Sequence, residues 1–459
     1  MAKKMPRKAA CFILSYLDLG KGSIDTLVQA QTRGMDRRDR AFVYELVYGV
    51  TRNKRALDYL IANNSLVPFQ RIDKMVLMLL RIGFYQLYVM DKVPAYAAVN
   101  ETVEQAKYFD NNMTRMVFFI NALLRNTVRN KPPESCGPNK LRGAVESYMD
   151  NSIDPTEKLG IIYSFPQWLA SRWVQDFGLE HAERLMKRCN VRAPVFIRVN
   201  HKKLNGNNIN GFLQDEGISV ERVNWAGDLY LVNEGQVTPG NRLFDEGYIQ
   251  PQDGASYMAA SLLNARQGET VADVCCGKGI KTGQFAQSMN NEGLIISVDN
   301  NQRSFEKFEE NMKRQKVSIA RPVIFDASTK WPVNYHFSKI FIDAPCSNYG
   351  VVRRHPEGKW NKSPDYLKTL QDTQHTMLQN ALDCLKPGGS LVYAVCTVEK
   401  NECQDVVEKA IEKTPGLKRM DIAKQRPELT EFVNSQGDIE IFPGQGNMDG
   451  FYAAKLSIN

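Results

Sequence analysis

KIFIDAPCSNYGVVRRHPEGKW, residues 339–360, joins a short apolar run to an acid, a cysteine and a group of basic residues. The run at 340–342 has the length and β-rich character of a parallel strand buried on both faces, and Asp343 and Pro345 end it. In open α/β sheets, ligands bind at the carboxyl ends of the strands. Cys346 follows that end directly. We therefore expect a reaction centre here, with a buried structural cysteine as the alternative, because free cysteines are among the most buried residues.

Three basic residues follow the cysteine in the same loop: Arg353, Arg354 and Lys359. Lysine and arginine contact nucleic-acid phosphates without reading sequence. We expect these three side chains to rim the catalytic mouth and to bind RNA there. The alternative is a solvated basic turn.

The chain as a whole is modestly basic. Its 459 residues include 59 Lys and Arg against 51 Asp and Glu, a net charge of +8. Residues 1–60 hold twelve basic and six acidic side chains, so most of the excess lies there. This favours an anionic partner without naming one, although a solvated helix face is the commoner reason for such charge. The 43% hydrophobic content supports sizeable cores, and the length allows two or three domains.

Cysteine spacing and hydropathy exclude several classes of protein. Nine cysteines are scattered without a C-x-x-C pair, which argues against a zinc site or a disulfide framework, so we expect no metal and a cytoplasmic location. The opening MAKKMPRKAACFILSYL lacks a cleavage site and predicts an amphipathic helix. The most apolar window, 75–90, contains Arg81 and Gln86 and falls short of a roughly 20-residue membrane span, so no membrane contact is expected.

Hydrophobic periodicity divides the chain into three parts. Residues 1–135 repeat apolar side chains at helical spacing and predict a bundle of five to seven helices. KPPESCGPN at 131–139 has the composition of a linker. Residues 140–245 predict further helices and then a small α/β piece, with strands at Val195–Val199 and Leu229–Val232 around a helix at 209–216.

Residues 246–459 alternate apolar strands with helices, which predicts a doubly wound parallel sheet. The expected strands are Val271–Cys275, Leu294–Val298, Pro322–Phe325, Ile340–Ile342 and Ser390–Val395, with two late runs at Ile439–Phe442 and Gly450–Leu456 completing the edge. The expected helices are Lys281–Met289, Ser304–Gln315, Asp365–Leu385 and Asn401–Lys413.

A glycine-containing turn follows the first of these strands. It runs Cys275, Cys276, Gly277, Lys278, Gly279, Ile280, Lys281, and the residue before Lys281 is not the glycine that a phosphate-binding P-loop requires. Such a turn before a helix lets the backbone approach a ligand. Asp299 and Asp326 end the next two strands, and an acid at that place can bind ribose hydroxyls of either NAD or S-adenosylmethionine. With Asp273 and Asp343, these acids favour a methyltransferase-type crevice.

A second cysteine, Cys396, ends the fifth strand in YAVCTVEKNE. The fourth and fifth strands are near neighbours in a doubly wound sheet, so Cys346 and Cys396 can face one crevice. Carbon 5 of cytosine attacks a methylsulfonium only after a thiolate has added to carbon 6, and cysteine supplies a strong nucleophile. A carboxyl group bonded to the ring at N3 would favour that addition, and a second base must remove the proton from carbon 5.

IDAPCSNYGVVRRHPEGKW and YAVCTVEKNE resemble the two cysteine motifs of the Sun/Fmu family of RNA cytosine-C5 methyltransferases. DRAFVYELVYGVTRNKRALDYLI and VFFINALLRN resemble the NusB-like RNA-binding domain at the start of the bacterial 16S rRNA (RsmB-type) members, and EGYIQPQDGAS and DGFYAAKL resemble the beginning and the last strand of their catalytic domain. The resemblance implies an all-α NusB-like bundle followed by a Rossmann-like class I domain that uses S-adenosylmethionine.

The resemblance also implies roles for single residues. Cys396 would be the nucleophile, Cys346 would assist product release, and Asp343 would contact the target ring near the methyl donor. Asp299 and Asp326 would hold the cofactor together with the loop that contains Lys281. Family members usually have Ala-Ala-Pro-Gly-Gly-Lys where this chain has residues 276–281, so Lys278 and Ile280 replace a proline and a glycine.

We therefore expect a monomeric methyltransferase that modifies carbon 5 of a cytidine in small-subunit rRNA, on a base unstacked to reach Cys396. One alternative is the same chemistry on tRNA. Another is a non-catalytic RNA-binding assembly factor whose altered loop no longer binds the cofactor. A dehydrogenase is a third option, but two cysteine motifs have no evident part in hydride transfer.

Overall fold

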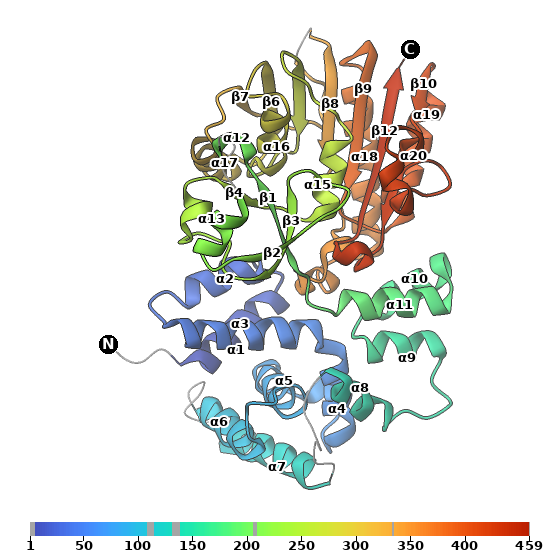
Figure 1. The fold of residues 1–459 in the computed structure, drawn as a ribbon. Helices are drawn as coiled ribbons and strands as arrows, with labels where there is room; N and C mark the ends of the chain where they lie inside the picture. Colours follow the sequence, from blue (N-terminus) through green and yellow to red (C-terminus); the bar gives the residue numbers. More distant parts are fainter. Residues whose placement is uncertain (1–4, 108–113, 131–137, 205–208, 333–334, 459) are drawn as a thin grey trace. The chain divides into compact units, whose positions relative to one another are not determined.

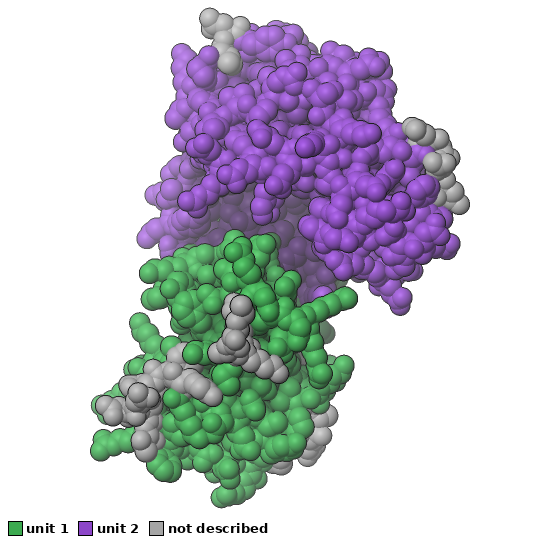
Figure 2. Space-filling view, turned by 90° about the vertical axis from the view of Figure 1, so that its left-hand side faces the viewer, with its two compact units in different colours: residues 1–190, 355–361 green, residues 191–354, 362–459 purple. Residues whose placement is uncertain are grey.

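The computed structural model describes residues 5–107, 114–130, 138–204, 209–332 and 335–458 (Figure 1). The chain forms two compact units, one of residues 1–190 with 355–361 and the other of residues 191–354 with 362–459 (Figure 2). No helix in the described ranges is long and apolar enough to cross a lipid bilayer. No group of three or more His, Cys, Asp or Glu side chains in these ranges is arranged to hold a metal ion.

The first unit begins with a helical bundle, as the periodicity predicted. Its described helices up to residue 130 are α1 (Pro6–Asp18), α2 (Ile24–Gln31), α3 (Arg37–Arg52), α4 (Lys54–Asn64), η1 (Phe69–Arg71), α5 (Lys74–Tyr88), α6 (Ala95–Lys107) and α7 (Thr114–Asn130). α5 packs against α1, α3, α4, α6 and α7 and is buried around most of its circumference. Its apolar window therefore forms the centre of a core, and its one buried cation, Arg81, pairs with Asp58 and Asp18 at 2.6 and 2.9 Å.

The same unit continues with α8 (Pro138–Glu146), α9 (Pro155–Ile162), α10 (Gln167–Phe177) and α11 (Leu179–Cys189). Residues 131–137 of the expected linker lie outside the described residues, and α8 begins at Pro138. The expected middle segment 140–245 is thus divided between the two units, because α8–α11 pack with the helical bundle while the strands after residue 191 do not.

The second unit opens with a small antiparallel sheet of strand order β2-β3-β1-β4. Its strands are β1 (Val195–Val199), β2 (Ser219–Arg222), β3 (Leu229–Glu234) and β4 (Ile249–Pro251), and its helices are α12 (His201–Leu204), α13 (Ile209–Asp215) and α14 (Arg242–Asp245). The predicted strands at β1 and β3 and the helix at α13 are confirmed. The sequence did not indicate β2 and β4, which are short edge strands.

The large sheet has the order β10-β12-β9-β8-β5-β6-β7, with β11 paired to β12. The parallel strands are β5 (Thr270–Val274), β6 (Leu294–Asp299), β7 (Ala320–Ile324), β8 (Phe337–Asp343) and β9 (Leu385–Val395), and the antiparallel edge contains β10 (Leu417–Arg419), β11 (Ile439–Ile441) and β12 (Phe451–Ile458). The helices are α15 (Gly254–Ser261), α16 (Ile280–Ser288), α17 (Gln302–Gln315), α18 (Pro364–Leu382), α19 (Gln404–Lys413) and α20 (Ile422–Gln425), and the 3-10 turns are η2 (Tyr349–Val351), η3 (Pro356–Lys359, in the first unit), η4 (Lys400–Glu402), η5 (Pro427–Phe432) and η6 (Gln445–Asn447).

Alternating side chains of the central strands enter two different cores. On β8, Phe341 packs with α15 and α16 on one face, whereas Ile340 and Ile342 pack with α18 and α19 on the other. All three are fully buried, as expected for a strand covered on both sides. The strand order reverses between β5 and β8, so their carboxyl ends flank the point where doubly wound folds bind ligands.

Candidate active site

The turn after β5 has a conformation that requires glycine at one position. Cys275, Gly277 and Gly279 all have positive φ, at 61°, 53° and 75°. A Cβ on Gly279 would lie 2.7 Å from the ring of Phe308 and 2.8 Å from Met312, so α17 packs directly on this turn. A Cβ on Gly277 would meet nothing within 4 Å, so there is open space next to this residue. Glycine is therefore required at position 279, and this chain has a glycine there.

Acids from successive strand ends gather around this turn. Burial raises the pKa of the Cys275 thiol, and Asp343, Asp299, Asp273 and Asp326, in decreasing order, raise it further. Hydrogen bonds place three of the four acids at the turn and at the helix that follows it: Asp299 to the Gly277 N–H, Asp273 to the Thr282 hydroxyl and Asp343 to Lys281. Asp273 is fully buried, whereas Asp326 is exposed and accepts hydrogen bonds from the Ser328 N–H and hydroxyl at 2.9 and 2.7 Å.

The crevice fits an adenosyl cofactor of the kind expected. The Asp299 carboxylate accepts the Gly277 N–H and the Asn301 N–H, both at 2.9 Å, and each oxygen keeps a lone pair for a ribose hydroxyl. The open space next to Gly277 gives the ligand room. Of the two residues that replace the usual proline and glycine, Lys278 is exposed and Ile280 begins α16.

Lys281 and Asp343 form an ion pair at the carboxyl ends of β5 and β8. The Lys281 Nζ lies 2.6 Å from the Asp343 Oδ2. Burial opposes the charge of Lys281, but Asp343 more than compensates and the lysine pKa is raised. The ammonium group therefore keeps its proton, and it orients the Asp343 carboxylate at the crevice.

The two cysteines meet in space, as the strand order predicted. The Cys346 Sγ lies 3.4 Å from the Cys396 Sγ. Both thiols also contact the Asn348 Oδ1, Cys396 at 2.8 Å and Cys346 at 3.4 Å. Cys346 is 5% exposed, while Cys396 is only partly buried. The sulfur that a substrate can reach more easily is thus that of Cys396.

The Cys346 thiol keeps its proton. The hydrogen bond with Cys396 raises the pKa of Cys346 well above its usual value, and burial adds to the effect. Cys346 is therefore a thiol at neutral pH that can donate a hydrogen bond to the sulfur of Cys396.

A buried polar network holds the two cysteine loops together. Glu402 accepts the Ser347 N–H at 2.8 Å and the Gln374 side-chain N–H at 2.9 Å. The Ser347 hydroxyl lies 2.6 Å from the Thr397 hydroxyl. Since Ser347 follows Cys346 and Thr397 follows Cys396, these bonds fix the residues next to each sulfur. The network preorganises the pair, because its members are all buried.

The expectation for Arg353 and Arg354 is corrected by their partners. Arg353 is 4% exposed and donates to the backbone carbonyls of Val191, Arg192, Asn447 and Met448 at 2.9–3.3 Å. Arg354 pairs with two carboxylates, Asp253 at 3.0 Å and Asp449 at 2.5 Å. Both guanidinium groups are therefore engaged in holding loops of the second unit and are not free to bind phosphate.

Lys359 is likewise not a phosphate ligand in this structure. It is 1% exposed and donates to the carbonyls of Arg52 and Ser164 at 2.8 Å and to the Asn190 Oδ1 at 3.2 Å. Burial lowers its pKa well below the usual value. Segment 355–361 belongs to the first unit, and Lys359 anchors it there.

Sequence reasoning missed two residues of this site. Asn348 adopts a left-handed conformation with φ of 59° between the cysteine and η2, a place where asparagine is well tolerated. Its position two residues after Cys346 was a usable signal. For Glu402 the sequence offered no signal beyond its position in the second cysteine motif, because its partners Ser347 and Gln374 are distant in the chain.

A doubly wound sheet with a glycine turn after its first parallel strand and an added antiparallel strand is the fold of S-adenosylmethionine-dependent methyltransferases. Family models match three consecutive parts: NusB over residues 4–129, the RsmF/B-like ferredoxin-like domain over 165–238, and the 16S rRNA methyltransferase RsmB/F over 260–457. The chain belongs to the 16S rRNA methyltransferase RsmB/F family, with a helical NusB domain at its start.

Similar proteins match along almost the whole chain. The probable ribosomal RNA small subunit methyltransferase B of Bacillus subtilis (strain 168) is 29% identical over 461 residues, covering 99% of each chain. The ribosomal RNA small subunit methyltransferase B of Pseudomonas syringae pv. tomato is 30% identical over 456 residues, covering 98% of this chain and 96% of its own. The crystal structure of PH0851 shares the fold, with a TM-score of 0.77 at 22% identity over 98% of each chain.

Proposed function

We propose that the protein methylates carbon 5 of a cytidine in 16S rRNA, with S-adenosylmethionine as methyl donor and a cysteine–cytosine adduct on the reaction path. The observation that carries the proposal is the 3.4 Å separation of the two sulfur atoms at the carboxyl ends of β8 and β9. The family and the names of the relatives support small-subunit rRNA as the substrate.

Cys396 is the nucleophile in this proposal. Its sulfur is the more exposed of the two, and the Cys346 thiol and Asn348 fix its direction. As the sulfur adds to carbon 6 and the C–S bond forms, the thiol loses its proton and ring N3 gains one, so electron density moves to carbon 5. Carbon 5 then becomes the nucleophile that an unactivated cytosine lacks.

Asp343 is placed to stabilise the charge that develops on the ring. Its carboxylate, held by Lys281 at 2.6 Å, lies at the end of the strand that also leads to Cys346. A carboxyl group bonded to N3 favours addition of the sulfur because it stabilises the protonated ring. Lys281 acts as a positioning residue for this carboxylate.

Cys346 assists the release of the product. After methyl transfer, the proton on carbon 5 is lost to a base and the C6–S bond breaks, which returns an electron pair to the Cys396 sulfur. Cys346 lies 3.4 Å away and holds a proton, so it can donate a hydrogen bond to the departing thiolate. Without it, the departing sulfur loses this stabilisation.

The cofactor supplies an electrophilic methyl group on a sulfonium. The residues assigned to hold it are the turn 275–281, the ribose-binding Asp299, and Asp326 at the adenine edge, with Asp343 beside the reacting methyl. The open space above Gly277 and the two remaining lone pairs of Asp299 support this assignment.

The test is bisulfite sequencing of rRNA and tRNA from cells that carry the wild-type gene, Cys396→Ala, or no gene. We expect one 16S cytidine to be protected only by the wild-type protein. Protection of a tRNA cytidine instead would show the same chemistry on another RNA. Calorimetry with S-adenosylmethionine gives the second readout, since a chain that neither binds it nor protects any cytidine would be a non-catalytic scaffold.

A further inference from the structure

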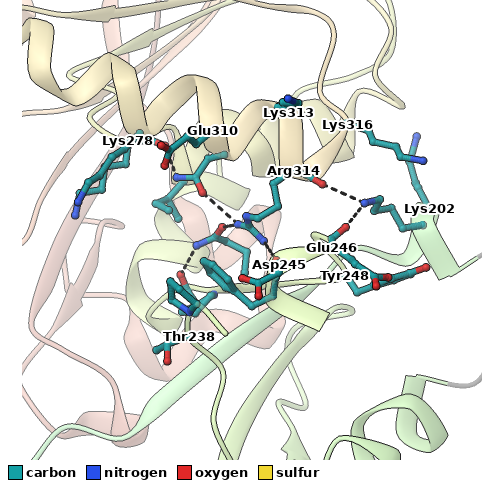
Figure 3. A pocket seen from close by; sticks show the side chains of 18 residues that line it. Lys202, Thr238, Asp245, Glu246, Tyr248, Lys278, Glu310, Lys313, Arg314 and Lys316 are labelled. Atoms are coloured by element: carbon teal, nitrogen blue, oxygen red, sulfur yellow. Dashed lines mark hydrogen bonds between the residues drawn. The ribbon is translucent and has the colours of Figure 1, made fainter. Parts of the chain in front are cut away.

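A large basic pocket lies in the second unit beside the turn that follows β5 (Figure 3). It has a volume of about 1290 Å³, and of its 18 lining residues seven are basic and three acidic. The basic side chains come from α12, from the turn after β5 and from α17 with the residue that caps it. None of the four acids or two thiols of the crevice lines this basic pocket, but Lys278 and Ile280 of the turn after β5 do.

Four lysines of the basic pocket point no ammonium group at an acid within ion-pair distance in the described ranges: Lys278, Lys307, Lys313 and Lys316. All four are exposed, and in the part of the chain that the structure describes none of their ammonium groups forms a hydrogen bond or an ion pair. Figure 3 shows Lys278 and Lys316 at opposite sides of the pocket, with Arg314 between them. Free cations thus lie at two opposite sides of the pocket.

The floor of the basic pocket is rigid. Arg314 donates to the carbonyls of Phe244 and Ile249 at 2.5 and 3.0 Å and stacks 4.1 Å from the Phe244 ring centroid. Lys203 donates to the Arg314 carbonyl at 3.0 Å. These contacts join α17 to the small sheet, so packing within the second unit fixes the residues at the base of the pocket.

Stabilisation of a helix end does not account for this charge. Lysine and arginine in the last turn of a helix interact favourably with its dipole, which explains Lys313 and Arg314. Lys278 and Lys202 come from other segments, and Lys307 lies in the middle of α17. Segments far apart in the sequence therefore bring like charges to one pocket, which costs free energy unless an anion binds there.

We propose that the basic pocket binds phosphodiester groups of the substrate RNA, next to the methyl-transfer site. The proposal rests on the function proposed above. Lysine is a point charge suited to sequence-independent phosphate contact. A volume of about 1290 Å³ exceeds the roughly 300–1,000 Å³ of ordinary small-molecule sites and suits a stretch of nucleic-acid backbone better than a single small anion.

The basic pocket is also connected to the cofactor turn. The Asn311 side chain on α17 donates to the Lys278 carbonyl at 2.9 Å, and the neighbouring Gly279 packs on Phe308 and Met312 of the same helix. RNA bound at the basic pocket would therefore contact the turn itself, since Lys278 and Ile280 line the pocket.

The test compares two triple variants of the full chain. Lys307→Gln, Lys313→Gln and Lys316→Gln remove three free cations of the pocket. Lys409→Gln, Lys413→Gln and Lys418→Gln remove three exposed lysines on and after α19 as the control. The probe is a 16S rRNA fragment that contains the methylated cytidine. The measurements are its Kd at several salt concentrations and the affinity for S-adenosylmethionine.

We expect the pocket variant to bind the RNA about tenfold or more weakly, and its plot of log K against log salt to flatten by about 2, since each phosphate contact to a single strand contributes roughly 0.7. The control should bind RNA as the wild type does, and both variants should keep their affinity for S-adenosylmethionine. Equal losses in both variants, or unchanged RNA binding by the pocket variant, would overturn the proposal while the methyltransferase function stands. If the wild type binds no RNA, both proposals fail together.

Discussion

The environments of Cys346 and Cys396 differ although their sulfur atoms lie 3.4 Å apart. Cys346 is buried and its pKa is raised first by the bond to its neighbour, whereas Cys396 faces the crevice more openly. Two thiols that differ in this way can supply a nucleophile and a hydrogen-bond donor at one place. The proposed division of roles thus rests on burial, which the sequence alone does not contain.

Asp273 at the end of β5 gives the protein a predicted pH dependence of stability. Burial raises its pKa to about 7, and one carboxyl oxygen has no hydrogen-bond partner while the other accepts the Thr282 hydroxyl at 2.5 Å. The folded state therefore binds a proton that the unfolded state releases near pH 4. Between about pH 4 and 7 the unfolded state binds fewer protons, so the free energy of unfolding falls as the pH rises.

The Asp273→Asn variant isolates this effect, because asparagine mimics the protonated carboxyl group. We expect the wild type to lose up to about 4 kcal/mol relative to the variant between pH 4 and 8, as measured by urea unfolding. Asp372→Asn, at an exposed position of α18, is the control and should show no such trend. A difference that is flat with pH, or that grows in the opposite direction, would show that Asp273 is ionised in the folded protein.

Single residues of the site divide into those that the sequence predicts and those that need coordinates. Cysteines and acids at strand ends were predictable, because strand ends follow from apolar runs. Arg353 and Lys359 were not, since the carbonyls and amide oxygens that bind them are distant in sequence. The sequence does not distinguish a loop lysine or arginine that binds phosphate from one that donates hydrogen bonds to buried backbone carbonyls.

Among the elements, the start of β12 keeps the two cysteine loops in place. The Gly450 N–H donates to the Gly350 carbonyl at 2.9 Å, and the Gly350 N–H donates to the Cys396 carbonyl at 3.1 Å. A Cβ on Gly350 would lie 2.0 Å from the Gly450 carbonyl oxygen. The loops after β8 and β9 and the last strand therefore meet where no side chain fits.

Gly350→Ala should separate these loops. We expect the free energy of unfolding to fall by about 2 kcal/mol or more, because the clash is with rigid backbone, and methyl transfer to be lost with it. Gly211→Ala on α13 is the matched control, since nothing lies within 4 Å of its Cβ, and it should stabilise the helix by about 0.5–1 kcal/mol. Urea unfolding and a methyl-transfer assay measure both. A Gly350→Ala protein with full activity would contradict the account of this junction.

Elements were predicted best where burial on both faces leaves a continuous apolar run. β5, β6, β8 and β9 were located by such runs within a few residues, and β1 was located at its full bounds. β2, β4 and β10 are three or four residues long and lie at sheet edges, and their sequences carry no apolar pattern of their own. Their existence depends on neighbouring strands that offer backbone partners.

At the scale of the whole molecule, the chain does not pass through its units in simple order. Residues 355–361 leave the loop after β8 and belong to the helical unit, and the helices at 138–190 belong to it as well. Composition and periodicity indicate where elements change type, so they predicted segments 1–135, 140–245 and 246–459. They do not indicate which of those elements share a core.

Lys359→Met tests whether Lys359 holds segment 355–361 in the first unit. The change leaves the carbonyls of Arg52 and Ser164 and the Asn190 amide without their shared donor, so we expect the free energy of unfolding to fall by about 2–4 kcal/mol. RNA affinity, measured under conditions where the variant is folded, should not change. Lys368→Met on the exposed face of α18 is the control for stability. A stable variant that binds RNA weakly would return Lys359 to the phosphate-binding role.

The most direct measurement is to trap the covalent intermediate. Labelled 16S rRNA fragment and S-adenosylmethionine are incubated with wild type, Cys346→Ala, Cys396→Ala or the double variant, and the products are separated on a denaturing gel. The account predicts a slow-migrating protein–RNA band for Cys346→Ala alone, because the adduct forms on Cys396 and its release is impaired. A band for Cys396→Ala and none for Cys346→Ala would reverse the two roles, and no band in either would contradict the covalent mechanism.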